Sequence, residues 1–227
     1  MRPQILLLTL CAVVMLLAGC SGQIPGGGII GNTPVSGQTI TYDGAINLSI
    51  KNGQPLAGTN LGYQGKSTDG RALLVIGSLQ APKQSLDSVT YKGSPVAGVV
   101  LDLSTRVGTY DQNTVNLIGT IHIEIQDPHP TANPPAAAQL TAYALPVQYN
   151  VNLNETIPGT LIQYLGQTPD GAKFSNVGEF PYRQQFDSVV WSGHLRDKVG
   201  LSLDLRLVSA SEDKAALAGT AQIRFEK

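Results

Sequence analysis

The feature that most constrains the fold is an internal repeat at a shift of about 100 residues. Gly58-Thr59 recurs as Gly159-Thr160, and Asp87-Ser88-Val89 recurs as Asp187-Ser188-Val189. The shift varies slightly along the chain, as single-residue changes in loop length would produce. We therefore expect one fold built twice, with residues 40–126 and 141–227 superimposing strand for strand. Further matched pairs are Tyr63 with Tyr164, Asp69-Gly70 with Asp170-Gly171, Tyr91 with Trp191, Leu101-Asp102-Leu103 with Leu203-Asp204-Leu205, and Gly119-Thr120 with Gly219-Thr220.

Apolar and polar residues alternate within each copy, which is the pattern of half-buried β-strands. No helical pattern of useful length separates the strands, so antiparallel pairing is favoured. The sequence therefore predicts an all-β fold, an antiparallel sandwich or small barrel, with two similar lobes of about six strands each. In the last strand of each copy the predicted buried residues are Val115, Leu117, Ile121 and Ile123, then Leu217, Ala221 and Ile223, while Thr120 and Thr220 face the other side.

A proline-rich segment separates the copies. Residues 127–140 contain four prolines, which cannot join a central strand. We expect this segment to be an extended, semi-rigid linker between a first β repeat at 39–126 and a second at 141–227. The sequence leaves open whether the repeats form two lobes or one closed structure.

The N-terminus has the three parts of a signal peptide: a positive start at Arg2, an apolar run from Ile5 to Ala18, and Leu17-Ala18-Gly19-Cys20. The run is shorter than the roughly 20 residues that a membrane-spanning helix needs. Leu17-Ala18-Gly19-Cys20 resembles the bacterial lipobox. That resemblance implies removal of residues 1–19 and attachment of a lipid to the sulfur of Cys20. Residues 20–38 then form a lipidated, glycine-rich tether.

The resemblance also implies that the protein is located in the cell envelope. Ser21 follows the lipidated cysteine, and by analogy with lipoproteins of two-membrane bacteria this favours the outer membrane. Cys11 would leave with the signal peptide, so no disulfide is expected in the mature chain.

No catalytic, metal-binding or cofactor motif is expected. The three histidines, His122, His129 and His194, occupy unrelated positions, whereas a metal site needs converging ligands. Ser192, His194 and Asp197 lie close in sequence, but no strand–turn–helix nucleophile motif accompanies them.

For three pairs of residues that recur in both copies, the sequence favours a structural role. Asp87 and Asp187 should bond to nearby backbone at the start of a strand. Asp102 and Asp204 should be solvated carboxylates on polar strand faces. Tyr91 and Trp191 should anchor the core, although an aromatic pair could also stack on a sugar.

Charge excludes one class of partner. The net charge is -1 and no basic stripe is present, so nucleic-acid binding is not expected. The leading hypothesis is a lipid-anchored envelope protein whose duplicated β module makes structural or protein–protein contacts. The alternative is a β-barrel carrier of a lipid or another apolar ligand, and the third is a secreted copper enzyme or hydrolase.

Overall fold

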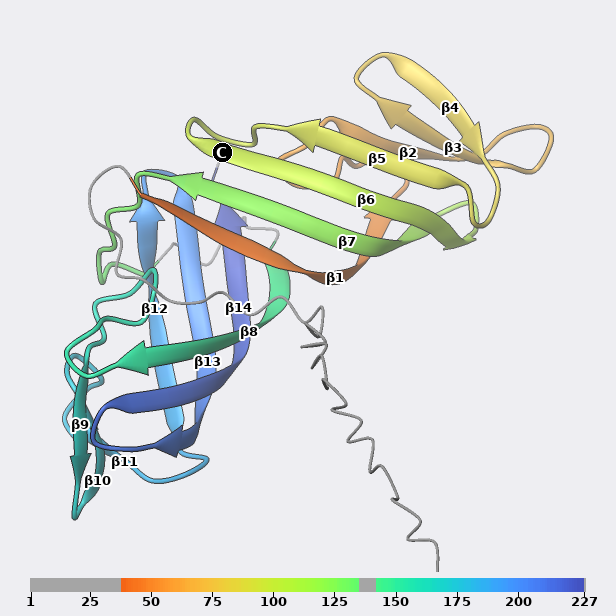
Figure 1. Ribbon diagram of the computed structural model, residues 1–227. Helices are drawn as coiled ribbons and strands as arrows, with labels where there is room; N and C mark the ends of the chain where they lie inside the picture. The colour runs from red at the N-terminus through yellow and green to blue at the C-terminus, as the bar shows by residue number, and fades with distance from the viewer. Residues whose placement is uncertain (1–37, 135–141, 227) are drawn as a thin grey trace, which may run out of the picture.

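The computed structural model describes residues 38–134 and 142–226, and these form an all-β fold of antiparallel strands (Figure 1). The predicted all-β, antiparallel class is therefore confirmed. The strands are β1 (Thr39–Lys51), β2 (Leu61–Lys66), β3 (Ala72–Ile76), β4 (Leu79–Lys83), β5 (Ser88–Gly93), β6 (Val99–Tyr110), β7 (Thr114–Gln126), β8 (Ala142–Asn152), β9 (Tyr164–Thr168), β10 (Gly171–Phe174), β11 (Tyr182–Arg183), β12 (Ser188–Arg196), β13 (Val199–Ala210) and β14 (Lys214–Phe225).

The strands form two lobes with the same strand order (Figure 1). The first lobe has a four-stranded sheet, β1-β7-β6-β5, and a three-stranded sheet, β2-β3-β4. The second lobe has the corresponding sheets β8-β14-β13-β12 and β9-β10-β11. Their pairing registers also correspond, because Gly119 pairs with Ile46 and Gly219 pairs with Val147. Superposition of the two repeats stays a prediction.

We expected about six strands per repeat, and among the described residues each lobe has seven. The short strands β4 and β11 account for the difference. β4 has no buried residue and β11 is two residues long, so neither shows an apolar stripe in the sequence.

The predicted core stripes are confirmed. The inward residues of β7 and β14 are buried, whereas Thr120 is exposed and Thr220 is half-buried. The predicted hairpin turns are also present, with positive φ at Gly70 between β2 and β3 and at Gly171, the first residue of β10. The confirmed buried residues are Val115, Leu117, Ile121, Ile123, Leu217, Ala221 and Ile223.

The match of Asp102 with Asp204 was wrong. Asp102 pairs with His122 on β7, and the residue that pairs with the equivalent Gln222 is Ser202. Asp102 therefore corresponds to Ser202, two residues before Asp204. A stripe of alternating leucines looks the same after a slip of two residues, so the sequence alone could not fix this register.

The two lobes share one continuous hydrophobic core through a reciprocal contact of two tyrosines. Tyr143 on β8 donates a hydrogen bond of 2.5 Å to the carbonyl of Ala57 in the first lobe. Tyr42, at the equivalent place on β1, lies against Gly159 in the second lobe, where a Cβ would be 3.1 Å from its phenol oxygen. Burial raises the pKa of both phenols above the ordinary tyrosine value, so both remain neutral.

The first part of the linker pairs with the second lobe. The backbone N–H of His129 donates to the carbonyl of Leu195 at 2.6 Å, and Thr131 forms an antiparallel bridge with His194. β12 is an edge strand of its sheet, so a proline-containing segment can pair there without interrupting a central ladder.

Candidate functional site

A groove of about 880 Å³ lies where the two lobes meet. Its first wall comes from β1, β6 and β7, mainly from their outward faces, and its second wall comes from β8 and β14. A groove at a junction between lobes is a common position for a ligand site. The first wall comprises Asp43, Gly44, Ala45, Asp102, Ser104, Thr120, Ile121 and His122, and the second comprises Pro146, Val147, Gln148, Ala218 and Gly219.

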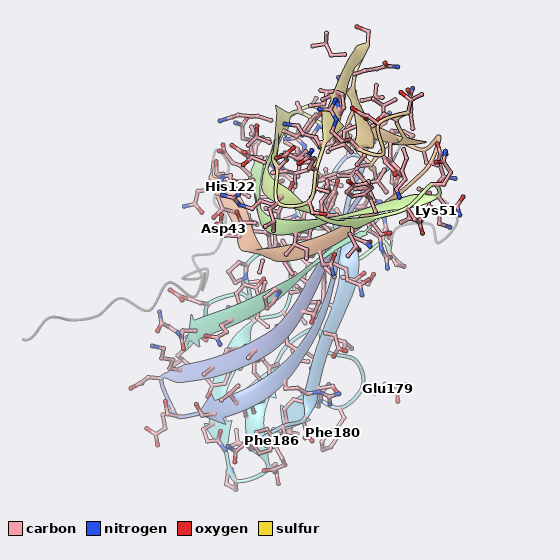
Figure 2. All side chains as sticks on the ribbon, turned by 90° about the vertical axis from the view of Figure 1, so that its right-hand side faces the viewer. Asp43, Lys51, His122, Glu179, Phe180 and Phe186 are labelled. Atoms are coloured by element: carbon pink, nitrogen blue, oxygen red, sulfur yellow. The ribbon has the colours of Figure 1, made fainter. Side chains whose placement is uncertain are left out.

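A row of ionisable side chains crosses the sheet that carries the first wall. Lys92, Asp102, His122 and Asp43 are successive pairing partners across β5, β6, β7 and β1. His122 Nδ1 lies 2.6 Å from Asp43 Oδ1, and the two residues are labelled next to one another in Figure 2. Lys92 Nζ lies 3.7 Å from Asp102 Oδ2. We call these four residues the charged row.

The equivalent row of the second lobe carries no charge. Ser192, Ser202, Gln222 and Ala144 are the corresponding partners across β12, β13, β14 and β8. The two serine hydroxyls are 3.1 Å apart. The same sheet is therefore built with neutral side chains, so the charged row is not a requirement of the fold.

The contact with Asp43 fixes how His122 faces the groove. A carboxylate accepts a hydrogen bond, so Nδ1 of His122 carries the proton that is donated to Asp43. Nε2 has no hydrogen-bond partner among residues 38–134 and 142–226. Of the two ring nitrogens, Nε2 is therefore the one left free to bind a ligand.

The other two histidines are closer together than the sequence suggested. His129 and His194 line one cavity of about 490 Å³, so their expected unrelated placement was wrong. The linker brings them together by pairing with β12. His194 has both ring nitrogens engaged, Nδ1 with the carbonyl of Asn133 at 2.7 Å and Nε2 with Glu226 Oε1 at 2.9 Å. In the described part of the chain, no group of three or more His, Cys, Asp or Glu side chains could hold a metal ion.

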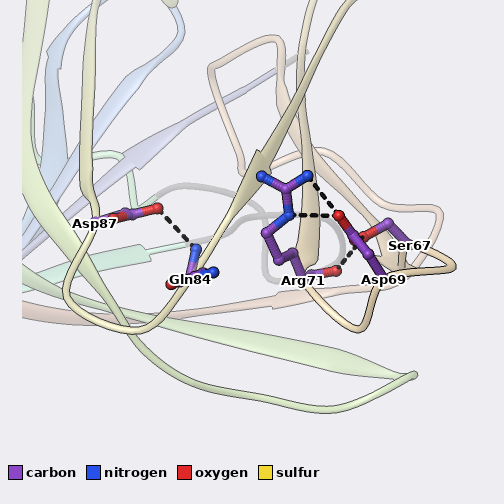
Figure 3. A network of polar contacts seen from close by, with 5 residues as sticks. All are labelled: Ser67, Asp69, Arg71, Gln84 and Asp87. Carbon is purple, nitrogen blue, oxygen red and sulfur yellow. Dashed lines mark hydrogen bonds and ion pairs between the residues drawn. The ribbon is translucent and has the colours of Figure 1, made fainter.

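The expected backbone bonds of the repeated aspartates are confirmed. The N–H of Gln84 donates to Asp87 Oδ2 at 2.8 Å (Figure 3), and that of Gln184 donates to Asp187 Oδ2 at 2.7 Å. Each bond closes a turn before β5 or β12. The turns hold Leu86 and Phe186 in left-handed backbone conformations, with φ of 72° and 70°.

The turns belong to the two lobe tips, which carry exposed apolar side chains at matched positions. Leu79 and Leu86 in the first lobe are 72% and 71% exposed. Phe180 and Phe186 in the second lobe are both 66% exposed and lie at one end of the molecule in Figure 2. These are the four most exposed large apolar side chains among the described residues. Leu79 lies at the turn between β3 and β4, and Leu86 follows the other end of β4, so the first pair flanks that strand. We call each pair an apolar tip.

The tip of the first lobe also holds a compact polar network (Figure 3). Arg71 Nε donates to Asp69 Oδ2 at 2.7 Å, and Ser67 Oγ donates to Asp69 Oδ1 at 2.5 Å. These bonds stabilise the carboxylate and lower the pKa of Asp69 from 3.8 to about 2. The network lies in the turn between β2 and β3, at the Lys83 end of β4 and away from Leu79.

The matched aromatics lie at the core, as expected. Trp191 is buried and Tyr91 is half-buried against the hydrophobic cluster. Each ring covers a glycine two residues later, Gly193 or Gly93, where a Cβ would meet the ring at less than 3 Å. Their burial leaves little ring surface for stacking on a sugar.

No family model, curated protein or solved structure matches this chain. Within the part of the chain that the structure describes, no helix has the length and apolar character to cross a membrane. Cys20, the predicted lipidation site, lies outside the described residues. Sequence reasoning missed the groove and the charged row, because no local motif joins Asp43 to His122 across 79 residues.

Proposed function

We propose that this chain is a lipid-anchored protein of the cell envelope whose two lobes each present an apolar tip to a protein partner. The observation that carries the proposal is the repetition of the tips. Leu79 and Phe180 follow the matched glycines Gly77 and Gly178, and Leu86 and Phe186 precede the matched Asp-Ser-Val segments. The anchor is supported by the lipobox resemblance at Cys20.

Backbone strain at the tips favours a binding role. An L-residue in the left-handed region costs about 1–2 kcal/mol, and glycine or asparagine would reduce that cost. Leu86 and Phe186 instead place bulky apolar side chains there and direct them into solvent. Folding gains little from such side chains, whereas a partner that covers them gains buried apolar surface.

The placement of the tips favours protein partners over a flat bilayer. The tip near β4 and the tip near β11 lie at opposite ends of the molecule (Figure 1). A single planar surface would not contact both tips at once. Two partner molecules, or two sites on one extended partner, would do so.

Replacing both strained tip residues by asparagine tests the contact. Asparagine tolerates positive φ, so L86N/F186N should fold with unchanged or slightly higher stability. We expect most partner capture to be lost when native membranes that contain this variant are crosslinked and the bound proteins are identified by mass spectrometry. The matched control exchanges the residues, as L86F/F186L, and should retain capture. Equal capture by the asparagine variant and the native chain would refute the role of the tips.

The anchor is tested separately at Cys20. Cys20→Ala removes the sulfur that would accept the lipid, so we expect loss of metabolic labelling by radioactive palmitate. The variant should stay uncleaved or become soluble, which membrane fractionation and mass spectrometry would show. Cys11→Ala is the matched control and should leave labelling intact. Normal processing and membrane partition of the Cys20→Ala chain would refute the anchor.

A further inference from the structure

We infer that the groove between the lobes binds an extended peptide segment through a basic side chain, lysine or arginine. This site is distinct from the apolar tips and does not depend on them. The inference starts from the asymmetry of the groove walls. Asp43 and Asp102 flank His122 on the first wall, while the second wall has no ionisable side chain. The lining therefore has two carboxylates and no lysine or arginine.

Both carboxylates can accept a further hydrogen bond. Asp43 uses Oδ1 for His122, which leaves Oδ2 for a ligand cation. Asp102 is only loosely paired, because its 3.7 Å distance to Lys92 exceeds that of a direct hydrogen bond and both side chains are substantially exposed. An ammonium or guanidinium group in the groove would satisfy these oxygens with charge-assisted bonds.

The rest of the lining suits the stem of such a side chain. Ala45, Pro146, Val147 and Ala218 give apolar surface opposite and beside the charged row. Lysine and arginine combine a methylene stem with a charged end, so they match a groove that is apolar on one wall and acidic on the other.

The size and polar groups of the groove favour a peptide over a small amine. A volume of about 880 Å³ is near the upper end of ligand pockets, and one amine would leave most of it to water. Ser104, Thr120 and Gln148 line the groove away from the carboxylates and can hydrogen-bond a peptide backbone. The neutral row in the second lobe shows that the charges are not needed to build the sheet.

The test uses the full chain in phosphatidylcholine nanodiscs and two pools of blocked heptapeptides. One pool has lysine at the centre and random flanking residues, and the other has uncharged norleucine at the centre. We expect selective enrichment of lysine peptides on the immobilised protein, measured by mass spectrometry, and weaker enrichment at high salt. The best lysine peptide should bind at least about tenfold more weakly to D43N/D102N, as loss of charge-assisted bonds predicts.

Two controls distinguish binding in the groove from non-specific binding to acidic side chains and from binding at the apolar tips. Asp204→Asn removes an exposed carboxylate of the second lobe that does not line the groove, and it should leave binding unchanged. The tip variant L86N/F186N should also bind normally, so failure of the tips and failure of the groove are distinguishable. Equal enrichment of both pools, no enrichment, or unchanged affinity of D43N/D102N would overturn the inference. If an equal concentration of the diamine cadaverine displaced the peptide, the inference that the groove binds a peptide would be overturned.

Discussion

Ile223→Asp should remove a large part of the stability of the protein. Ile223 is fully buried in the middle of its sheet, paired with Leu201 on β13 and Tyr143 on β8. The change deletes a packed apolar side chain and leaves a carboxyl group without a prepared partner. We expect a loss of about 4 kcal/mol or more, against a total of about 5–15 kcal/mol for a typical domain. Urea unfolding followed by circular dichroism would measure it.

The neighbouring residue supplies the control for that prediction. Gln222 lies on the opposite face of β14 and is partly exposed, so Gln222→Asp adds the same side chain where water can reach it. Its effect should lie within about 0.5 kcal/mol of zero. Equal unfolding midpoints for the two variants would contradict the placement of Ile223 in the core.

Gly119→Ala and Gly219→Ala should each be strongly destabilising, although alanine is the smallest side chain that could be added. A Cβ at Gly119 would lie 2.1 Å from the carbonyl oxygen of Ser104, and one at Gly219 would lie 2.0 Å from that of Asp204. Both obstacles are backbone atoms of the adjacent strand, so the strands would have to separate. We expect a cost of about 3 kcal/mol for each change, measured by the shift of the urea midpoint.

Gly62→Ala is the matched control for the two central glycines. Gly62 is also a strand residue, but its nearest contact for a new Cβ is at 3.6 Å, an ordinary packing distance. Its φ is not in the left-handed region, so alanine brings no backbone strain there. Alanine should be neutral or slightly stabilising at this position. A loss at Gly62 as large as that at Gly119 would contradict the explanation by close strand approach.

The sequence predicted those parts of the fold that depend on local pattern. Alternation identified the buried faces of β7 and β14 because a strand has a period of two residues. The Asp-Gly pairs marked turns because glycine accepts positive φ, and Asp87 and Asp187 formed the expected bonds because their partners are only three residues away. Each of these inferences needed only information within a few residues.

The features that the sequence did not reveal depend on contacts between distant segments. The charged row exists only because β1 pairs with β7 and β7 pairs with β6 in one register. The proximity of His129 to His194 follows from the linker pairing with β12, which periodicity does not indicate. The leucine stripes of β6 and β13 even favoured a wrong match, because pattern alone does not detect a two-residue slip.

The charged row is present in the first lobe and has a neutral counterpart in the second. This difference determines how many sites of each kind one molecule carries. A two-fold dimer of identical lobes would carry every surface feature in pairs. Here the apolar tips occur in both lobes, whereas Asp43, Asp102 and His122 have neutral counterparts in Ala144, Ser202 and Gln222. On the proposals made above, the described part of one molecule carries two apolar tips at matched positions and one acidic groove. An assembly built on these proposed contacts would hold two tip-bound partners for each groove-bound segment. A pair of identical lobes would instead carry equal numbers of tips and charged rows, so it would not fix that ratio.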